Sequence, residues 1–121
     1  MAETDRIAGL KGSVGIKAPC RMRSAVNIAL SGVQTLNGVI GLAGDRVLVD
    51  TQVTASQNGI YAMATGAWVR EPDWDGAYDV LRGTLIYVLE GEGQFGKFYH
   101  LNTDSVVVGT TAAAFVVGPT P

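Results

Sequence analysis

Short apolar or alternating runs, separated by turns rich in glycine and asparagine, repeat along most of this chain. The turns recur at intervals of roughly 8 to 12 residues, which is typical of all-β proteins. The apolar runs between them are too short for stable helices. We therefore predict an all-β fold, a compact antiparallel β-sandwich or small barrel of about 7 to 8 short strands. Helix is expected at most in the first residues.

The stretch from Gly44 to Arg70 is the centre of this prediction, because it contains the clearest strand and turn patterns. Asn58 and Gly59 both tolerate a positive φ angle, so this pair predicts a hairpin turn. Such a meander buries one face and needs neighbouring strands for stability. The strands expected here are Arg46–Val49, 60–64 and 67–70.

Further strands are expected on both sides of this meander. In the first of them, alternation predicts that Cys20, Met22, Ser24 and Val26 face inward. The run from Leu81 to Leu89 is apolar on both faces, which predicts a central strand or one covered by a second chain. Asn37-Gly38 predicts a tight hairpin. The segments expected to be strands are 19–28, 33–36, 39–40, 81–89, Lys97–Leu101, 106–108 and 114–117.

One continuous pattern in 121 residues predicts a single β domain over residues 17–118. Residues 1–16 are expected to form an N-terminal arm, and residues 119–121 a C-terminal tail. Five of the nine Lys and Arg residues lie in the first 23 positions. A basic arm of this kind docks on an acidic surface of a partner or touches nucleic acid, and a solvated flexible tail is the equal alternative.

The amino-acid composition limits the partners and the cellular location that can be expected. Charged residues make up 17% of the chain, below the usual value of about 25%. Low charge on a small domain predicts that part of its surface is covered in an assembly. The net charge of −2 makes nucleic acid an unexpected partner. No apolar run reaches the roughly 18 residues of a membrane helix, and the polar beginning is unlike a signal peptide. Synthesis in a reducing cytoplasm is therefore expected.

Residues for catalysis or metal binding are few. The chain has one cysteine, Cys20, and one histidine, His100, so neither a disulfide nor a triad can be assembled. No catalytic, cofactor or metal site is predicted, and Cys20 is expected in the core. The spacing of Asp73, Asp75 and Asp79 leaves a weak cation site as an alternative to turn capping. Asp73 and Asp75 as a glycosidase pair are disfavoured, because no cleft is indicated around them.

The order of these segments also resembles a small β-module of tailed-bacteriophage virion proteins, found in fibres and in free-standing decoration proteins. Matching residues begin with Pro19 to Val26 and continue through Asn27-Ile28-Ala29-Leu30-Ser31-Gly32-Val33-Gln34-Thr35-Leu36-Asn37-Gly38. They then follow the order GDRVLV (44–49), NGIY (58–61), GAWVRE (66–71) and GTTAAAF (109–115). The likeness covers roughly residues 17 to 117. Each signature is a strand or turn pattern, so the order and spacing carry the resemblance.

The resemblance implies a non-enzymatic structural protein located in the virion. A capsid decoration (cement) protein is favoured, because the module stands alone with a short arm. Its expected partners are itself, as a homodimer or homotrimer, and the major capsid or other virion proteins. The residues expected to make these contacts are ones expected to be exposed: Arg6, Lys11, Lys17, Trp74, Tyr78 and Phe95.

Two alternatives belong to other classes. A tail-fibre or head-appendage adhesin would bind a host surface glycan by stacking sugar rings on aromatic side chains, with Asp73 and Asp75 accepting hydrogen bonds. Trp68 is expected to face inward and so contributes least. A depolymerase fragment would lose turnover on Asp73→Ala. The aromatic residues considered for stacking are Trp68, Trp74, Tyr78 and Tyr99.

Overall fold

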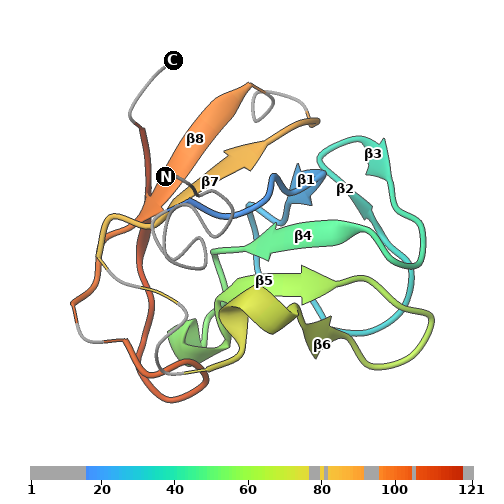
Figure 1. The fold of residues 1–121 in the computed structure, drawn as a ribbon. Coiled ribbons are helices and arrows are strands. Elements are labelled where there is room, and N and C mark those ends of the chain that lie inside the picture. Colours follow the sequence, from blue (N-terminus) through green and yellow to red (C-terminus); the bar gives the residue numbers. More distant parts are fainter. Residues whose placement is uncertain (1–15, 77–79, 81, 92–95, 105, 119–121) are drawn as a thin grey trace, which may run out of the picture.

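The computed structural model describes residues 16–76, 80, 82–91, 96–104 and 106–118. In this part of the chain the regular structure is strands and two short 3₁₀ turns, without an α-helix (Figure 1). The all-β prediction is confirmed, with nine strands rather than the 7 to 8 expected. The strands are β1 (Met22–Arg23), β2 (Thr35–Leu36), β3 (Val39–Ile40), β4 (Arg46–Val49), β5 (Gly59–Ala62), β6 (Val69–Arg70), β7 (Leu85–Val88), β8 (Lys97–Leu101) and β9 (Phe115–Val117); the 3₁₀ turns are η2 (Ala55–Gln57) and η3 (Pro72–Trp74).

The first large sheet has the order β1-β4-β5-β6 and contains the predicted meander. Antiparallel pairing sets Val47 of β4 opposite Tyr61 of β5. The prediction of a wholly antiparallel fold is wrong at two edges. β1 runs parallel to β4, with Met22 opposite Val47, and the preceding residues form two isolated parallel bridges to β7. A parallel pair requires a long crossover, and the chain between β1 and β4, which includes the β2–β3 hairpin, supplies it.

The other two sheets are antiparallel. The second large sheet has the order β7-β8-β9, and the smallest is the β2–β3 hairpin. Asn37 and Gly38 join β2 to β3 with φ angles of 51° and 81°. Two consecutive positive φ angles are what a two-residue hairpin turn of type I′ requires. The tight hairpin predicted at this Asn-Gly pair is confirmed.

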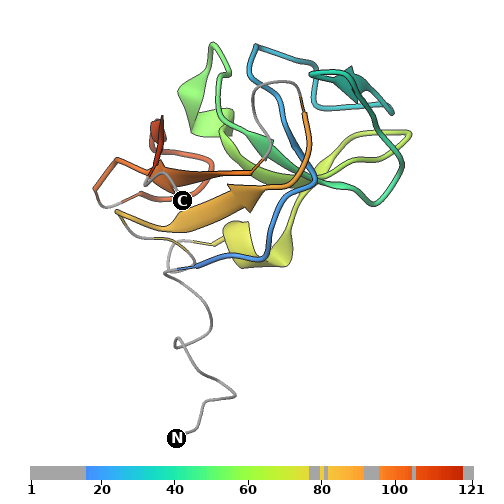
Figure 2. The same cartoon turned by 90° about the horizontal axis from the view of Figure 1, so that it is seen from above.

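Residues 16–24 join the two large sheets through backbone hydrogen bonds. On one side the Cys20 amide donates to the Tyr87 carbonyl at 2.9 Å. On the other side the Arg21 amide donates to the Arg46 carbonyl at 2.8 Å, and the Ser24 amide to the Leu48 carbonyl at 2.9 Å. Figures 1 and 2 show this segment, in blue, beside β7. One edge of each large sheet is therefore covered by the same stretch of chain.

A buried cluster draws side chains from both large sheets. It includes Leu48 and Ile60 from the first sheet and Ile86 and Leu101 from the second, with Cys20 between them. Burying these apolar side chains stabilises the arrangement by roughly 1.5 to 3 kcal/mol each. No sheet closes on itself among the described residues, so the finer expectation of one sandwich or barrel stays a prediction.

Several expected strands are shorter than predicted, and one is missing. Cys20, Met22 and Ser24 are buried as predicted, but Val26 is 59% exposed, so its inward assignment is wrong. Ala25 has a φ angle of 60°, and this left-handed residue ends the strand alternation before Val26. The predicted strand 106–108 is a turn instead, in which the Val107 carbonyl accepts hydrogen bonds from the amides that follow it.

The second Asn-Gly pair is not a hairpin turn. Asn58 is extended, with φ −62° and ψ 148°, and Gly59 is already paired with Val49 in the sheet. The Asn58 side chain is buried, where it accepts from the Gln52 amide at 3.0 Å and donates to the Ala113 carbonyl at 2.8 Å. The reversal is made before it, by η2. The pair therefore ties β5 to a distant loop.

Candidate interaction surfaces

The main candidate site is the outer face of the β7-β8-β9 sheet. Alternate side chains of a strand point to opposite faces, and the core takes Ile86 and Val88 from β7. The strand register places the remaining alternate residues of β7 and β8 together on the other side, with Val116 opposite His100. None of these side chains is fully buried. We define the outer face as Ile16, Leu85, Tyr87, Phe98, His100 and Val116.

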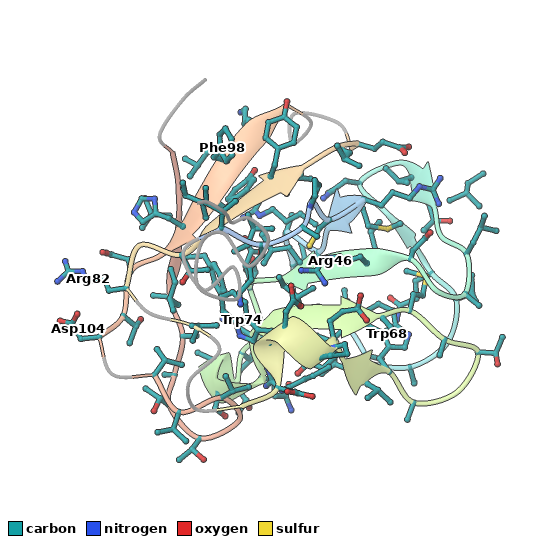
Figure 3. All side chains as sticks on the ribbon, viewed as in Figure 1. Arg46, Trp68, Trp74, Arg82, Phe98 and Asp104 are labelled. Carbon is teal, nitrogen blue, oxygen red and sulfur yellow. The ribbon has the colours of Figure 1, made fainter. Side chains whose placement is uncertain are left out.

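The outer face is apolar and ordered by its own contacts. Tyr87 and Phe98 meet edge-to-face with ring centroids 4.9 Å apart. The His100 ring has Nδ1 2.9 Å from the Gly118 carbonyl oxygen, which fixes its orientation. Figure 3 places Phe98 beside β8, well separated from Trp74 near η3. No Asp, Glu, Lys or Arg belongs to this face, which suits contact with another protein surface.

A second candidate is a surface depression of about 500 Å³. Its only basic side chain is Arg21, whose Nη1 lies 2.5 Å from Asp45 Oδ2 and whose Nε lies 3.2 Å from Glu90 Oε2. These two carboxylates already neutralise the guanidinium, so the depression offers little attraction for an anion. It is lined by Arg21, Asn37, Gly38, Val39, Ile40, Glu90 and Gly91.

The third feature is an ion-pair cluster above Cys20. Arg46 Nη1 lies 2.9 Å from Asp73 Oδ1 and Nη2 lies 2.5 Å from Oδ2, with Glu71 Oε2 3.3 Å from Nη1. Burial raises the pKa of the Cys20 thiol from 9.0 to about 12. The thiol is therefore protonated at neutral pH and is not a nucleophile. The prediction of Cys20 as a core residue is confirmed.

The contacts of Asp73 also decide whether it could bind a cation or act as one of two glycosidase carboxylates. Both carboxylate oxygens of Asp73 face Arg46, so Asp73 is not available as a cation ligand or as half of a glycosidase pair in this conformation. Asp79 lies outside the described residues. Within the residues that can be examined, no group of three or more His, Cys, Asp or Glu side chains is close enough to hold a metal ion.

Two of the residues expected to make exposed subunit contacts are buried instead. Trp74 is fully buried, and its ring centroid lies 5.5 Å from that of Phe115. Lys17 is also buried. The exposure assumed for both residues is therefore wrong, because tertiary packing that hydropathy cannot reveal covers them. The other selected residues, Arg6, Lys11, Tyr78 and Phe95, lie outside the described part of the chain.

The aromatic side chains considered for sugar stacking are also inside. Trp68 faces inward as predicted, and its Nε1 donates to the Gly32 carbonyl at 2.9 Å. Trp74 and Tyr99 are buried as well. These rings have no free face for a sugar. Sequence reasoning missed Phe98 and Tyr87 as surface aromatics, although the double-sided apolar pattern of Leu81–Leu89 was the available signal.

No protein-family model, curated protein or solved structure matches this chain. The resemblance to the phage module therefore rests on the order of sequence signatures alone. Among the described residues there is also no helix that is long and apolar enough to cross a membrane.

Proposed function

We propose that this chain is a non-enzymatic structural protein of a tailed-bacteriophage particle and that it acts by binding other protein subunits. The observation that supports binding is the outer face of the β7-β8-β9 sheet, an uncharged surface that includes two aromatic rings. Apolar faces of this kind are stabilised when another protein covers them. The virion setting is supported by the sequence resemblance over roughly residues 17 to 117.

Within the particle we favour a capsid decoration protein, made in the bacterial cytoplasm and carried in the virion. This choice rests on the resemblance to free-standing decoration proteins, which covers roughly residues 17 to 117. Binding across the joints between shell subunits would favour the assembled shell by mass action. We take the two large sheets to form one sandwich that leaves the outer face free for this contact, with the chain acting as a homodimer or homotrimer.

The adhesin alternative has less support. Its stacking residues Trp68, Trp74 and Tyr99 are buried, and Asp73 is engaged by Arg46. No observation on the described residues favours a glycan over a protein partner.

The first experiment is to quantify this chain against the major shell protein in purified particles. A decoration protein is expected at a copy number comparable with that of the shell protein. A handful of copies would indicate an appendage and contradict the decoration proposal. Absence from purified particles would contradict the virion proposal as a whole.

The second experiment tests the outer face. Particles lacking the chain are incubated with the wild type, with Phe98→Lys or with Val107→Lys, and their heat resistance is measured. Phe98 belongs to the outer face, whereas Val107 is an exposed residue in the turn after β8 and serves as the matched control. Wild type and Val107→Lys are expected to bind and protect, and Phe98→Lys to fail. Equal binding by all three would remove the outer face from the proposal.

A further inference from the structure

The edge strands of the sheets are not equally protected. Residues 16–24 cover the β7 edge of one large sheet and the β4 side of the other. Near β6, the Trp68 amide donates to the Leu30 carbonyl at 2.9 Å and the Gly32 amide to the Gly66 carbonyl at 3.0 Å. On the side of β9 away from β8, none of the described segments pairs with it. β9 is therefore an edge of the second large sheet that no described segment covers.

The hydrogen-bond pattern shows which β9 groups point away from the sheet. The Gly118 amide donates to the Phe98 carbonyl at 2.7 Å, and the Ala114 carbonyl accepts from the Asn102 amide at 2.8 Å. In an antiparallel ladder, bonded and non-bonded pairs alternate. Residues 114, 116 and 118 therefore direct their backbone groups toward β8, and the N–H and C=O groups of Phe115 and Val117 point outward.

No charged side chain in the local sequence blocks this edge, and the two nearby prolines, Pro119 and Pro121, come after β9 in the sequence. Val116 is 41% exposed and Val117 is 55% exposed. From Ser105 to Pro121 the chain contains no Asp, Glu, Lys or Arg. Proteins commonly protect an edge strand with such charges, because an unprotected edge is a template for pairing with another strand.

We propose that a second copy of this chain pairs antiparallel with β9, edge to edge, about a twofold axis at Val116. Phe115 of one copy and Val117 of the other would then exchange two hydrogen bonds on each side of the axis. The two Val116 residues would form the non-bonded pair, whose side chains lie close together. An uncharged strand meets its own copy without like-charge repulsion, and a twofold axis makes the contact self-complementary.

The proposed function includes a homodimer or homotrimer, and this pairing names the contact that would form the dimer. It rests on the proposed function only for its location in a phage particle. Because Val116 belongs to the outer face, the axis would join the outer faces of two copies into one surface across a six-stranded sheet. A contact of three residues per strand is small. Copies held close together on a shell would therefore pair more completely than copies in dilute solution.

Cysteine cross-linking tests the axis directly. In this register the two Val116 Cα atoms lie about 4.5 Å apart, within disulfide range. The two Val117 residues are diagonal neighbours, about 7 to 8 Å apart, and cannot be bridged without backbone movement. Val116→Cys, Val117→Cys and Val107→Cys are oxidised mildly at equal concentration and compared on non-reducing gels. The native Cys20 is buried and does not compete.

A covalent dimer formed at least tenfold faster by Val116→Cys than by Val117→Cys or Val107→Cys supports the proposal. Equal rates would indicate random collision, and the absence of a Val116→Cys dimer, or a faster Val117→Cys dimer, would also overturn it.

As a second measurement, Val116→Lys and Val116→Glu are mixed. Sedimentation should detect mixed dimers and no dimers of either variant alone; dimers of Val116→Lys alone would overturn the proposal. Copy number in particles is measured separately, so the pairing and the virion function can fail independently.

Discussion

The Arg46 guanidinium donates two parallel hydrogen bonds to the Asp73 carboxylate, from Nη1 to Oδ1 at 2.9 Å and from Nη2 to Oδ2 at 2.5 Å. Paired bonds between a guanidinium and a carboxylate are stronger and more directional than a single contact. The pair links β4 to η3, which carries the buried Trp74. Asp73 therefore has a structural role in holding η3 against the first large sheet.

Replacing Asp73 with Ala should lower the free energy of unfolding by about 1 to 3 kcal/mol, because the half-buried Arg46 guanidinium loses its main partner. Urea unfolding measures this loss. Asp104→Ala is the matched control, since Asp104 pairs with Arg82 at 3.4 Å on the exposed surface, and it should cost less than about 1 kcal/mol. Equal losses for the two variants would contradict the structural role of Asp73.

The Cys20 thiol gives a prediction in alkaline solution. Burial raises the pKa of this thiol to about 12, whereas a thiol in the unfolded chain has its ordinary pKa of 9.0. Below pH 9 both states keep the proton, so this group has no effect on the pH dependence of stability. Between about pH 9 and 12 the unfolded state releases its proton first, and stability should fall as pH rises.

Unfolding of wild type and Cys20→Ala, followed from pH 8 to 11, checks this dependence. Burial also raises the pKa of Tyr61 and Tyr99, so the wild-type curve contains their titration as well. The difference between the two proteins isolates Cys20, and the alanine variant should show the shallower decline. Parallel curves would show that the thiol ionises equally in both states.

Gly59 is required by close packing. A Cβ atom at this position would lie 2.5 Å from Arg70 Nη1 and 2.8 Å from Trp74 Cδ1. Arg70 is held by hydrogen bonds to the Asn58 and Ser56 carbonyls, so it cannot move freely. Gly59→Ala should therefore destabilise the fold by about 1 to 3 kcal/mol.

Thermal unfolding of Gly59→Ala is best compared with Gly66→Ala. A Cβ atom at Gly66 meets nothing within 4 Å. Gly66→Ala should therefore change stability by less than about 1 kcal/mol, and in the favourable direction, because Gly66 has no positive φ angle. A Gly59→Ala protein as stable as Gly66→Ala would refute the packing argument.

Ala25 offers an opportunity for stabilisation. Its φ angle of 60° costs an L-residue roughly 1 to 2 kcal/mol, and glycine removes this cost. Glycine also adds about 0.5 to 1 kcal/mol of backbone entropy to the unfolded chain, so the net gain from Ala25→Gly should be about 0.5 kcal/mol.

The control for this gain is Ala29→Gly, at an exposed residue without a positive φ angle. Here only the entropy term applies, so stability should fall. The two substitutions are chemically identical and should shift the denaturation midpoint in opposite directions. A loss of stability in both would show that residue 25 is not left-handed in the folded protein.

Local sequence patterns predicted the fold best where strand alternation agrees with tertiary contacts. Arg46–Val49 and Lys97–Leu101 have the predicted bounds. The two Asn-Gly pairs show the limit of such reasoning, because Asn37 adopts the turn conformation and Asn58 does not. Asn58 is instead held extended by bonds to Gln52 and to the distant Ala113, contacts that no local rule contains.

The candidate surface was predicted only in part. The apolar character of both faces of Leu81–Leu89 indicated a second apolar face on this strand, where Leu85 and Tyr87 lie; that another chain covers it stays a prediction. Trp74 was misjudged because flanking aspartates gave its segment the appearance of an exposed loop. Its burial against Phe115 depends on a contact between residues far apart in the chain.

Residues 16–24 have a consequence for how the protein is made. This early segment forms backbone hydrogen bonds with β4, with the much later β7, and with the residues just after β7, where the Leu89 amide donates to the Cys20 carbonyl at 3.0 Å. Contacts between distant parts of a chain slow folding. On the ribosome, the Cys20 carbonyl therefore cannot receive this hydrogen bond until Leu89 has left the exit tunnel.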